Sequence, residues 1–263
     1  MWGTMDAKKT EADQLNSGDR IVVTVKRLGI NGEGVGYYRR KTVFVPGALP
    51  DETVKAEVIR AHPRHVEAKL IGIEKRSPHR TKPFCPVYER CGGCQLQHTD
   101  MAGQLEGKTE IVRESFARYA GIEQPPIRPM AGMAYPWGYR HKAQLQAGTL
   151  RGHTALGLYS PASRRLVDIA GCPVQHPDIN RAADAIRDIV EELGIPPYRE
   201  KEKTGLLRTV AIRRSSHTGE LQVTFVLAKD RLPQEERLIG AITAKLPDVV
   251  QIAANIQPRN TPL

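Results

Sequence analysis

The sequence predicts an α+β protein in which a small closed, OB-like β-barrel precedes a mixed α/β central domain. Three observations lead to this prediction. Short alternating strands separated by Gly, Pro and Asn turns fill the first part of the chain. A charged, proline-bearing stretch follows them, and beyond residue 136 the periods of strands and helices are mixed. The 263 residues, 40% of them hydrophobic, suffice for the cores of two ordinary domains.

The first segment, residues 1–16, is polar and aperiodic, and we predict a disordered tail there. The barrel is predicted over 17–75, with strands in the alternating stretches at 20–28, 42–47, 53–60 and 65–73. The glycine run at 28–36 superficially offers a phosphate-binding loop. A dinucleotide fingerprint must open a helix, however, and strand-like residues follow this run, so we predict a barrel hairpin.

The next segment, 76–98, is predicted to be a linker and a cysteine loop, because it is charged, proline-bearing and rich in turn residues. A helix is predicted over 99–121, ended by Gly121. The apolar face of this helix comprises Met101, Leu105, Val112, Phe116 and Tyr119. The central domain is predicted over 125–263, with helices at 178–193 and 233–246. Its strands are expected at 139–146, 156–160, 165–169, 206–214, 220–228 and 249–256.

The net charge and the lack of long apolar runs indicate what kind of molecule the protein binds and where in the cell it is found. Lys and Arg number 39 against 29 acidic residues, and a surplus of ten positive charges attracts polyanions, nucleic acid first among them. The chain has no apolar run near the ~20 residues of a membrane span and no visible targeting segment. We therefore predict a cytoplasmic protein without a membrane partner.

Four cysteines carry the clearest chemical signal. Cys85, Cys91 and Cys94 lie within one turn-rich segment, FCPVYERCGGCQLQH, and Cys172 follows in DIAGCPVQH. Sulfurs clustered in this way favour a metal centre over disulfides, which need an oxidising compartment, and over inert buried thiols. Spacing alone leaves zinc and iron–sulfur as alternatives. A CxxC redox pair at Cys91 and Cys94 lacks a thioredoxin-like βαβ context.

Basic residues interleaved with tyrosines mark candidate RNA contacts, with a solvated charged surface as the alternative explanation. The candidates in the barrel and in the strand at 139–146 are Lys26, Arg27, Tyr37, Arg39, Arg40, Lys41, Arg140 and Lys142. The histidines show no helical i, i+4 pair near a carboxylate, so we expect most of them to be surface residues rather than ligands. Those considered are His62, His65, His79, His98 and His176.

Several spaced motifs together resemble the RNA (uracil-5)-methyltransferases that carry a TRAM domain and a 4Fe-4S cluster. GDRIVVTVKRLGINGEGVG with VFVPGALPDE resembles the TRAM barrel, an OB-like RNA-binding module. CPVYERCGGCQLQH resembles the most specific motif of the family, C-x5-C-x2-C followed by Q-x-x-H. YRHKAQ, LGLYSPASRRLVDIAGCP and NIQPRNT resemble central-domain motifs, with Cys172 at the fourth ligand position.

The resemblance implies a 4Fe-4S cluster on the four cysteines, an rRNA or tRNA substrate, with 23S rRNA expected, and S-adenosylmethionine as methyl donor. Family members continue into a Rossmann-like domain that supplies the S-adenosylmethionine site, the nucleophilic cysteine and the general base. Because the sequence stops at Leu263, we predict the N-terminal and central part of such an enzyme, with the Rossmann-like methyltransferase domain absent. On this prediction the helix at 99–121 packs on the missing domain.

The chemistry of the reaction leads to the same expectation. Uracil C5 attacks a methyl sulfonium only after a thiolate has added to C6, and a base must then remove the C5 proton. All four cysteines fit ligand positions, and the sequence has no strand, glycine loop and helix unit for an adenosine. We therefore predict no catalytic residue, no S-adenosylmethionine bound by this chain, and a truncated protein that is inactive without a catalytic domain supplied in trans. The alternative is a stand-alone RNA-binding iron–sulfur protein.

Overall fold

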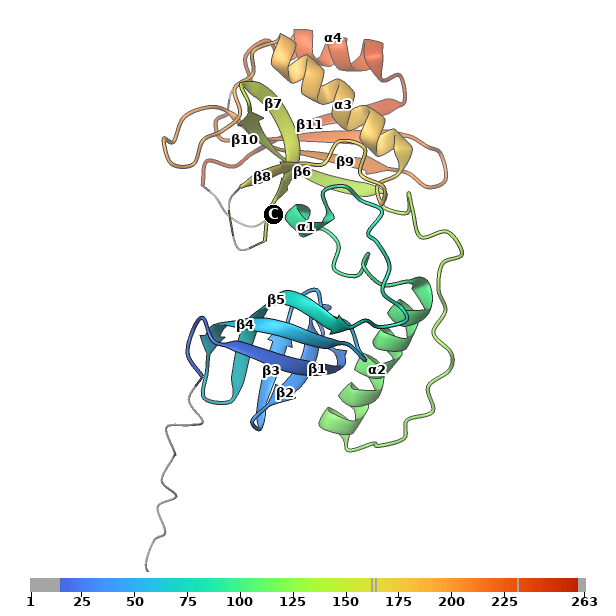
Figure 1. Cartoon of the computed structure of the whole chain (residues 1–263). Coiled ribbons are helices and arrows are strands. Elements are labelled where there is room, and N and C mark those ends of the chain that lie inside the picture. Colours follow the sequence, from blue (N-terminus) through green and yellow to red (C-terminus); the bar gives the residue numbers. More distant parts are fainter. Residues whose placement is uncertain (1–14, 162, 164, 231, 260–263) are drawn as a thin grey trace, which may run out of the picture. The chain divides into compact units, whose positions relative to one another are not determined.

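The structure, a computed structural model, describes residues 15–161, 163, 165–230 and 232–259 (Figure 1). The predicted tail at 1–16 therefore lies almost entirely outside the described residues. The chain divides into two compact units, one formed by Met1–Pro83 and Gln95–Gly132 and the other by Phe84–Cys94 and Met133–Leu263. The predicted segment 76–98 is thus shared between them, and its central part, with three cysteines, folds with the second unit.

The first unit contains the predicted barrel, closed in the strand order β1-β2-β3-β5-β4. Its strands are β1 (Arg20–Leu28), β2 (Gly34–Tyr38), β3 (Lys41–Val45), β4 (Thr53–Ala61) and β5 (His65–Lys75). Alternate side chains of β1 fill the barrel interior: Ile21, Val23 and Val25 are buried, while their neighbours on the strand face outward. The glycine run leads into β2, as predicted. A Cβ at Gly36 would lie 2.4 Å from Val23 Cγ1, so packing requires glycine there.

A buried ion pair fixes the start of the predicted linker on the barrel. Glu52 is fully buried, and Arg80 holds both of its carboxylate oxygens, with Nε 2.5 Å from Oε1 and Nη2 2.7 Å from Oε2. Arg80 Nη2 also donates to the Gly47 carbonyl at 2.6 Å, and the Leu49 amide donates to Glu52 at 2.9 Å. Every oxygen of this carboxylate therefore has a donor, as a buried charge requires.

His98 lies beside this ion pair and gives the barrel a pH dependence. Burial, helped by the nearby Arg80 charge, lowers the pKa of His98 to about 4. In the unfolded chain the His98 imidazole takes up a proton near pH 6.5, whereas in the folded chain this imidazole stays neutral down to about pH 4. We expect the free energy of unfolding to fall by on the order of 3 kcal/mol over that interval.

Urea unfolding of the native protein and of His98→Gln between pH 7.5 and pH 4 measures this loss. The variant should lose less stability over the interval than the native protein, and His217→Gln, at an exposed position of the second unit, should behave like the native protein. Parallel curves for native and His98→Gln would contradict the expected role of His98.

The helix predicted at 99–121 is α2 (Met101–Ala120), which begins at its cap Asp100 and ends at Gly121, with φ 66°. It packs on β1 of the barrel, where a Cβ at Gly107 would lie 2.5 Å from Leu28 Cδ1. We expected its apolar face to pack on a domain outside the chain. In the structure the beginning of the helix rests on the barrel, while Phe116 and Tyr119 are 43% and 80% exposed.

The second unit is a six-stranded sheet with two helices on one face (Figure 1). The strand order is β11-β10-β9-β6-β7-β8, and of the pairs in the described sheet only β10 and β11 run parallel. Its elements are α1 (Tyr88–Cys91), β6 (Lys142–Leu150), β7 (His153–Tyr159), β8 (Leu166–Asp168), α3 (Pro177–Glu192), β9 (Leu207–Arg214), β10 (Leu221–Leu227), α4 (Glu235–Lys245) and β11 (Val249–Ile256). The predicted apolar side of α3 is buried in the main core. No helix of the described chain has the length and apolar character needed to cross a membrane.

Candidate metal centre and nucleic-acid interface

The four cysteines belong to one unit, although a segment of the other unit separates the first three from the fourth in sequence. Phe84–Cys94 folds with Met133–Leu263, so the loop with Cys85, Cys91 and Cys94 shares a unit with Cys172. The sulfurs are also close enough to influence one another electrostatically. Burial raises the pKa of the Cys91 thiol, and the Cys172, Cys85 and Cys94 sulfurs raise it further against an opposing hydrogen bond from the Gly93 amide.

Local hydrogen bonds fold the three-cysteine loop back on itself. The Tyr88 amide donates to the Cys85 carbonyl at 3.2 Å and the Cys91 amide to the Val87 carbonyl at 2.9 Å, which forms the single turn α1. Gly92 ends that turn with φ 69°. A Cβ at Gly92 would lie 2.4 Å from Cγ of Pro161, so only glycine lets the chain pass there.

Cys172 lies in a turn before α3. Its carbonyl accepts hydrogen bonds from the Gln175 amide at 3.2 Å and from Asn180 Nδ2 of α3 at 3.0 Å. Cys91 and Cys172 pack, partly buried, against the apolar core of the unit, and among the described residues the cysteines form no disulfide. Four thiols in one unit, two of them at the edge of its apolar core, are a donor set that zinc and iron–sulfur clusters use, although no three of these sulfurs lie within 4.8 Å of one another among the described residues. The predicted ligand set stays a prediction.

Two predicted RNA contacts, Arg39 and Arg40, form the whole loop between β2 and β3. Tyr38 pairs with Lys41, so the loop has two residues, and both have positive φ, 45° and 64°. Such loops favour Asn-Gly, because other residues pay a steric cost in the left-handed region. The Arg39 guanidinium carbon lies 5.3 Å from the centre of the Tyr38 ring, and Tyr37 is 56% exposed. The arrangement holds two guanidinium groups at the tip of a barrel hairpin at a cost in backbone strain.

The remaining predicted RNA contacts of the barrel differ in how accessible they are to a phosphate group. Lys26 is exposed on β1, and Lys41 is half-buried at the start of β3. Arg27 is engaged within the unit, because its Nε lies 2.6 Å from Oε1 of Glu114 on α2. Sequence patterns give no sign of this pair. Arg27 is therefore less suited to bind phosphate than the hairpin residues.

The contacts predicted at 139–146 lie in the second unit. The Arg140 amide donates to the Val174 carbonyl at 2.9 Å, just before β6 begins at Lys142. Lys142 is exposed and lies opposite Arg213 of β9. Like charges placed opposite each other cost stability, which a bound polyanion relieves. No sequence pattern indicates Arg213, because the pairing of β6 with β9 decides which residue lies opposite Lys142.

Comparison with known proteins assigns the barrel and relates the chain to enzymes. Residues 14–71 match the TRAM domain family. The chain is 46% identical over 256 residues to a protein of Bacillus cereus and 46% identical over 251 residues to one of Halalkalibacterium halodurans, both named as uncharacterized RNA methyltransferases. The matches cover 97% and 95% of this chain but 56% and 54% of those proteins. The chain thus spans about half the length of these relatives.

A solved structure extends the likeness to the fold. The tRNA (uracil-54, C5)-methyltransferase of Pyrococcus abyssi, solved in complex with S-adenosyl-L-homocysteine, superposes with a TM-score of 0.65. It is 24% identical, and the match covers 92% of this chain and 52% of that one.

These matches correct several predictions. We predicted a truncated protein, only the N-terminal and central part of its family, with the Rossmann-like methyltransferase domain absent. Proteins named as RNA methyltransferases instead match along 95% to 97% of the chain, and a solved methyltransferase shares its fold over 92% of it. The prediction of truncation relied on the position of the last residue, which carries no such information. The predictions of a chain that does not bind S-adenosylmethionine and of a catalytic domain in trans relied on four ligand cysteines and on the lack of a glycine-loop unit, and they are not retained.

These matches identify a domain and a class of related proteins, but not the reaction or the RNA on which this chain acts. The chain carries a TRAM domain, and over nearly its whole length it is a homologue of proteins named as RNA methyltransferases.

Proposed function

We propose that this protein takes part in the S-adenosylmethionine-dependent methylation of uracil C5 in an rRNA or tRNA, binding the RNA through its TRAM barrel and holding a 4Fe-4S cluster on four cysteines. One observation carries the proposal: the match to RNA methyltransferases extends over 97% of the chain, at 46% identity, and so includes both the barrel and the cysteine unit. The fold shared with a uracil-C5 methyltransferase over 92% of the chain supports the choice of reaction.

The barrel binds RNA in this proposal through the hairpin tip formed by Arg39 and Arg40. Arginine is an unfavourable residue at both positions of this two-residue loop, because both have positive φ. The presence of two arginines despite this cost supports a role for their charge in binding RNA. Guanidinium groups bind phosphate oxygens in pairs of hydrogen bonds, and the exposed ring of Tyr37 nearby offers a stacking surface for a base. Lys142 and Arg213 form a separate pair of basic residues on the second unit, which we propose as a further phosphate contact.

The cysteine site fits an iron–sulfur cluster by its donor set. Cys85, Cys91, Cys94 and Cys172 supply four thiolates, and Cys91 and Cys172 contact an apolar core that limits access of water. When bound, the cluster would join the loop at 84–94 to the turn before α3. Methylation at uracil C5 needs a thiolate that adds to C6, and a coordinated thiolate does not serve. The proposal therefore assigns the nucleophile to none of these four residues.

The test of the reaction is the modification state of cellular RNA. Deletion of the gene that encodes this chain is expected to abolish a 5-methyluridine in rRNA or tRNA, measured by nuclease digestion and mass spectrometry. Re-expression of the native protein should restore the modification, and re-expression of Cys172→Ser should restore it less. Unchanged 5-methyluridine at every site after deletion would rule out the proposed reaction.

The hairpin tip provides a prediction in which stability and RNA affinity change in opposite directions. Changing Arg39→Asn together with Arg40→Gly gives the loop its preferred residues, so the free energy of unfolding should rise by about 1 kcal/mol. RNA binding should weaken, and the slope of log K against log salt should flatten by up to about 1.4 if each arginine neutralises one phosphate of single-stranded RNA.

Titrations of RNA at several salt concentrations measure the slope. The matched control is Lys69→Gln with Lys75→Gln, which removes the same charge from exposed positions on β5. If the control flattens the slope as much as the hairpin variant does, net charge rather than the hairpin binds the RNA.

A further inference from the structure

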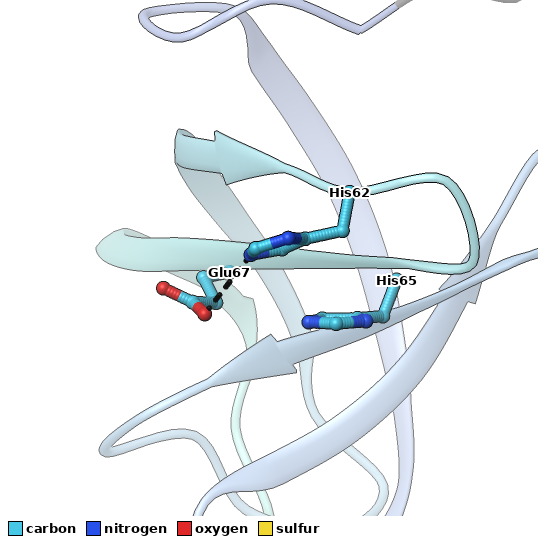
Figure 2. Close-up of side chains that lie close together, drawn as sticks. All are labelled: His62, His65 and Glu67. Carbon is cyan, nitrogen blue, oxygen red and sulfur yellow. Dashed lines mark hydrogen bonds and ion pairs between the residues drawn. The ribbon is translucent and has the colours of Figure 1, made fainter.

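Three side chains of types that bind metal ions lie close together at the turn between β4 and β5 of the barrel. The side chains of His62, His65 and Glu67 converge, and one ligand atom from each lies within 4.8 Å of the other two (Figure 2). We propose that these three residues form a binding site for a divalent transition metal, with Zn²⁺ as the ion that the donor set fits best. The site is independent of the proposed methylation reaction.

The β4–β5 hairpin fixes these side chains. The His62 amide donates to the His65 carbonyl at 2.8 Å, and Pro63 restricts the backbone of the turn between them. On β5, Val66 and Ala68 are buried in the barrel, so the alternation of a strand places His65 and Glu67 together on its outer face. Because the turn is tight and the strand belongs to a closed barrel, the backbone positions of all three residues are set without a ligand.

The distances are close to those of a metal site. Zinc lies about 2.0–2.1 Å from histidine nitrogen and carboxylate oxygen, so two tetrahedral ligand atoms lie about 3.3 Å apart. His62 Nε2 is 3.2 Å from Glu67 Oε1, which already matches that separation. No two of the three ligand atoms lie more than 4.8 Å apart, so the largest separation exceeds this value by at most about 1.5 Å, a gap that side-chain rotation closes.

The pairing of two imidazoles distinguishes this cluster from an ordinary ion pair. The rings of His62 and His65 are stacked, with centroids 4.2 Å apart and an interplanar angle of 20°. The cluster therefore offers two imidazole nitrogens beside the carboxylate, where an ion pair offers one. Two imidazoles and one carboxylate are a known zinc donor set that leaves a fourth position for water or another oxygen. The Glu67 side chain is 47% exposed, so an ion can enter from solvent.

His153 and Glu191 provide a matched control within the same chain. His153 Nδ1 lies 2.8 Å from Glu191 Oε1, so this pair offers one imidazole and one carboxylate on an exposed surface, as His62 and Glu67 do. No second imidazole completes it among the described metal-ligand groups. If surface His–Glu pairs alone held the ion, removing His153 would weaken binding as much as removing His62.

The experiment is calorimetric titration of the full chain with Zn²⁺ after anaerobic cluster reconstitution, so that the cysteines are occupied. We expect one site per chain in the native protein and at least a tenfold loss of affinity in each of His62→Ala, His65→Ala and Glu67→Gln, with His153→Ala unchanged. Glu67→Gln keeps the shape of the side chain, and circular dichroism checks that each variant is folded.

Co²⁺ as a second probe identifies the donors. A cobalt ion on this site should give visible d–d absorption without the intense near-ultraviolet band of thiolate ligation, and His62→Ala should abolish that absorption. Equal Zn²⁺ affinity in the native protein and all three ligand variants, or a cobalt spectrum with only thiolate bands, would overturn the proposal.

Discussion

Cys172→Ser is expected to remove most of the iron from anaerobically purified protein. Three ligands seldom hold a structural cluster tightly, and in the proposed cluster Cys172 would join the loop at 84–94 to the rest of its unit. Native protein should be brown, with iron and acid-labile sulfide in equal amounts, and the variant should be nearly colourless. One zinc ion and no iron in native protein, measured by elemental analysis, would contradict the cluster.

A second variant checks that geometry, rather than loss of one sulfur alone, controls cluster binding. Gly92→Ala leaves all four cysteines in place but brings a Cβ to 2.4 Å from Cγ of Pro161, so the loop must move. We expect substantial iron loss in this variant. Gly121→Ala is the matched control, because Gly121 has a similar φ, 66°, with nothing within 4 Å of its Cβ position. Equal iron content in the two variants would show that the contact with Pro161 does not control cluster binding.

The barrel was predictable because a strand buried on one side records its period directly in sequence. Ile21, Val23 and Val25 alternate with polar neighbours, and each is buried. The sequence indicates β2 only as part of the predicted hairpin, because glycines occupy two of its three buried positions, Gly34 and Gly36, and leave no period of two. A Cβ at either position would crowd a side chain of β1, and this tertiary contact leaves no sign in the local sequence pattern.

Contacts made by tertiary pairing were not predictable. Lys142 lies opposite Arg213 and Arg27 contacts Glu114 only because strands and a helix meet in register. The histidines illustrate the same limit. They lack the helical spacing i, i+4 near a carboxylate, but a hairpin brings together His62 and His65 across its turn, and a strand brings together His65 and Glu67 at i, i+2. The chain ending at Leu263 misled the prediction of truncation, because a boundary of a sequence has no physical pattern to interpret.

Glu52→Gln is expected to destabilise the barrel by about 3–5 kcal/mol, the range for removing one partner of a buried ion pair. The substitution leaves the Arg80 guanidinium, whose side chain is 11% exposed, without its counter-charge. Burial raises the pKa of the Glu52 carboxyl, but the hydrogen bonds from Arg80 and Leu49 outweigh it and hold the pKa below its usual value of 4.5. The ion pair therefore stabilises the fold above about pH 4.5 and is lost as the pH falls through the lower folded pKa.

The matched control for this ion pair lies on the same barrel. Lys55 and Glu74 form an ion pair at 3.2 Å with side chains 57% and 42% exposed, and Glu74→Gln should cost under about 1 kcal/mol because water screens the charges. Amide hydrogen exchange in β1 and β4 reports unfolding of the barrel separately from the second unit. The double variant Glu52→Leu with Arg80→Leu removes both charges, so it should be less destabilised than the sum of the single changes. Additive losses, or equal losses for Glu52→Gln and Glu74→Gln, would mean that the buried pair does not act as a unit in fixing the chain at Arg80 to the barrel.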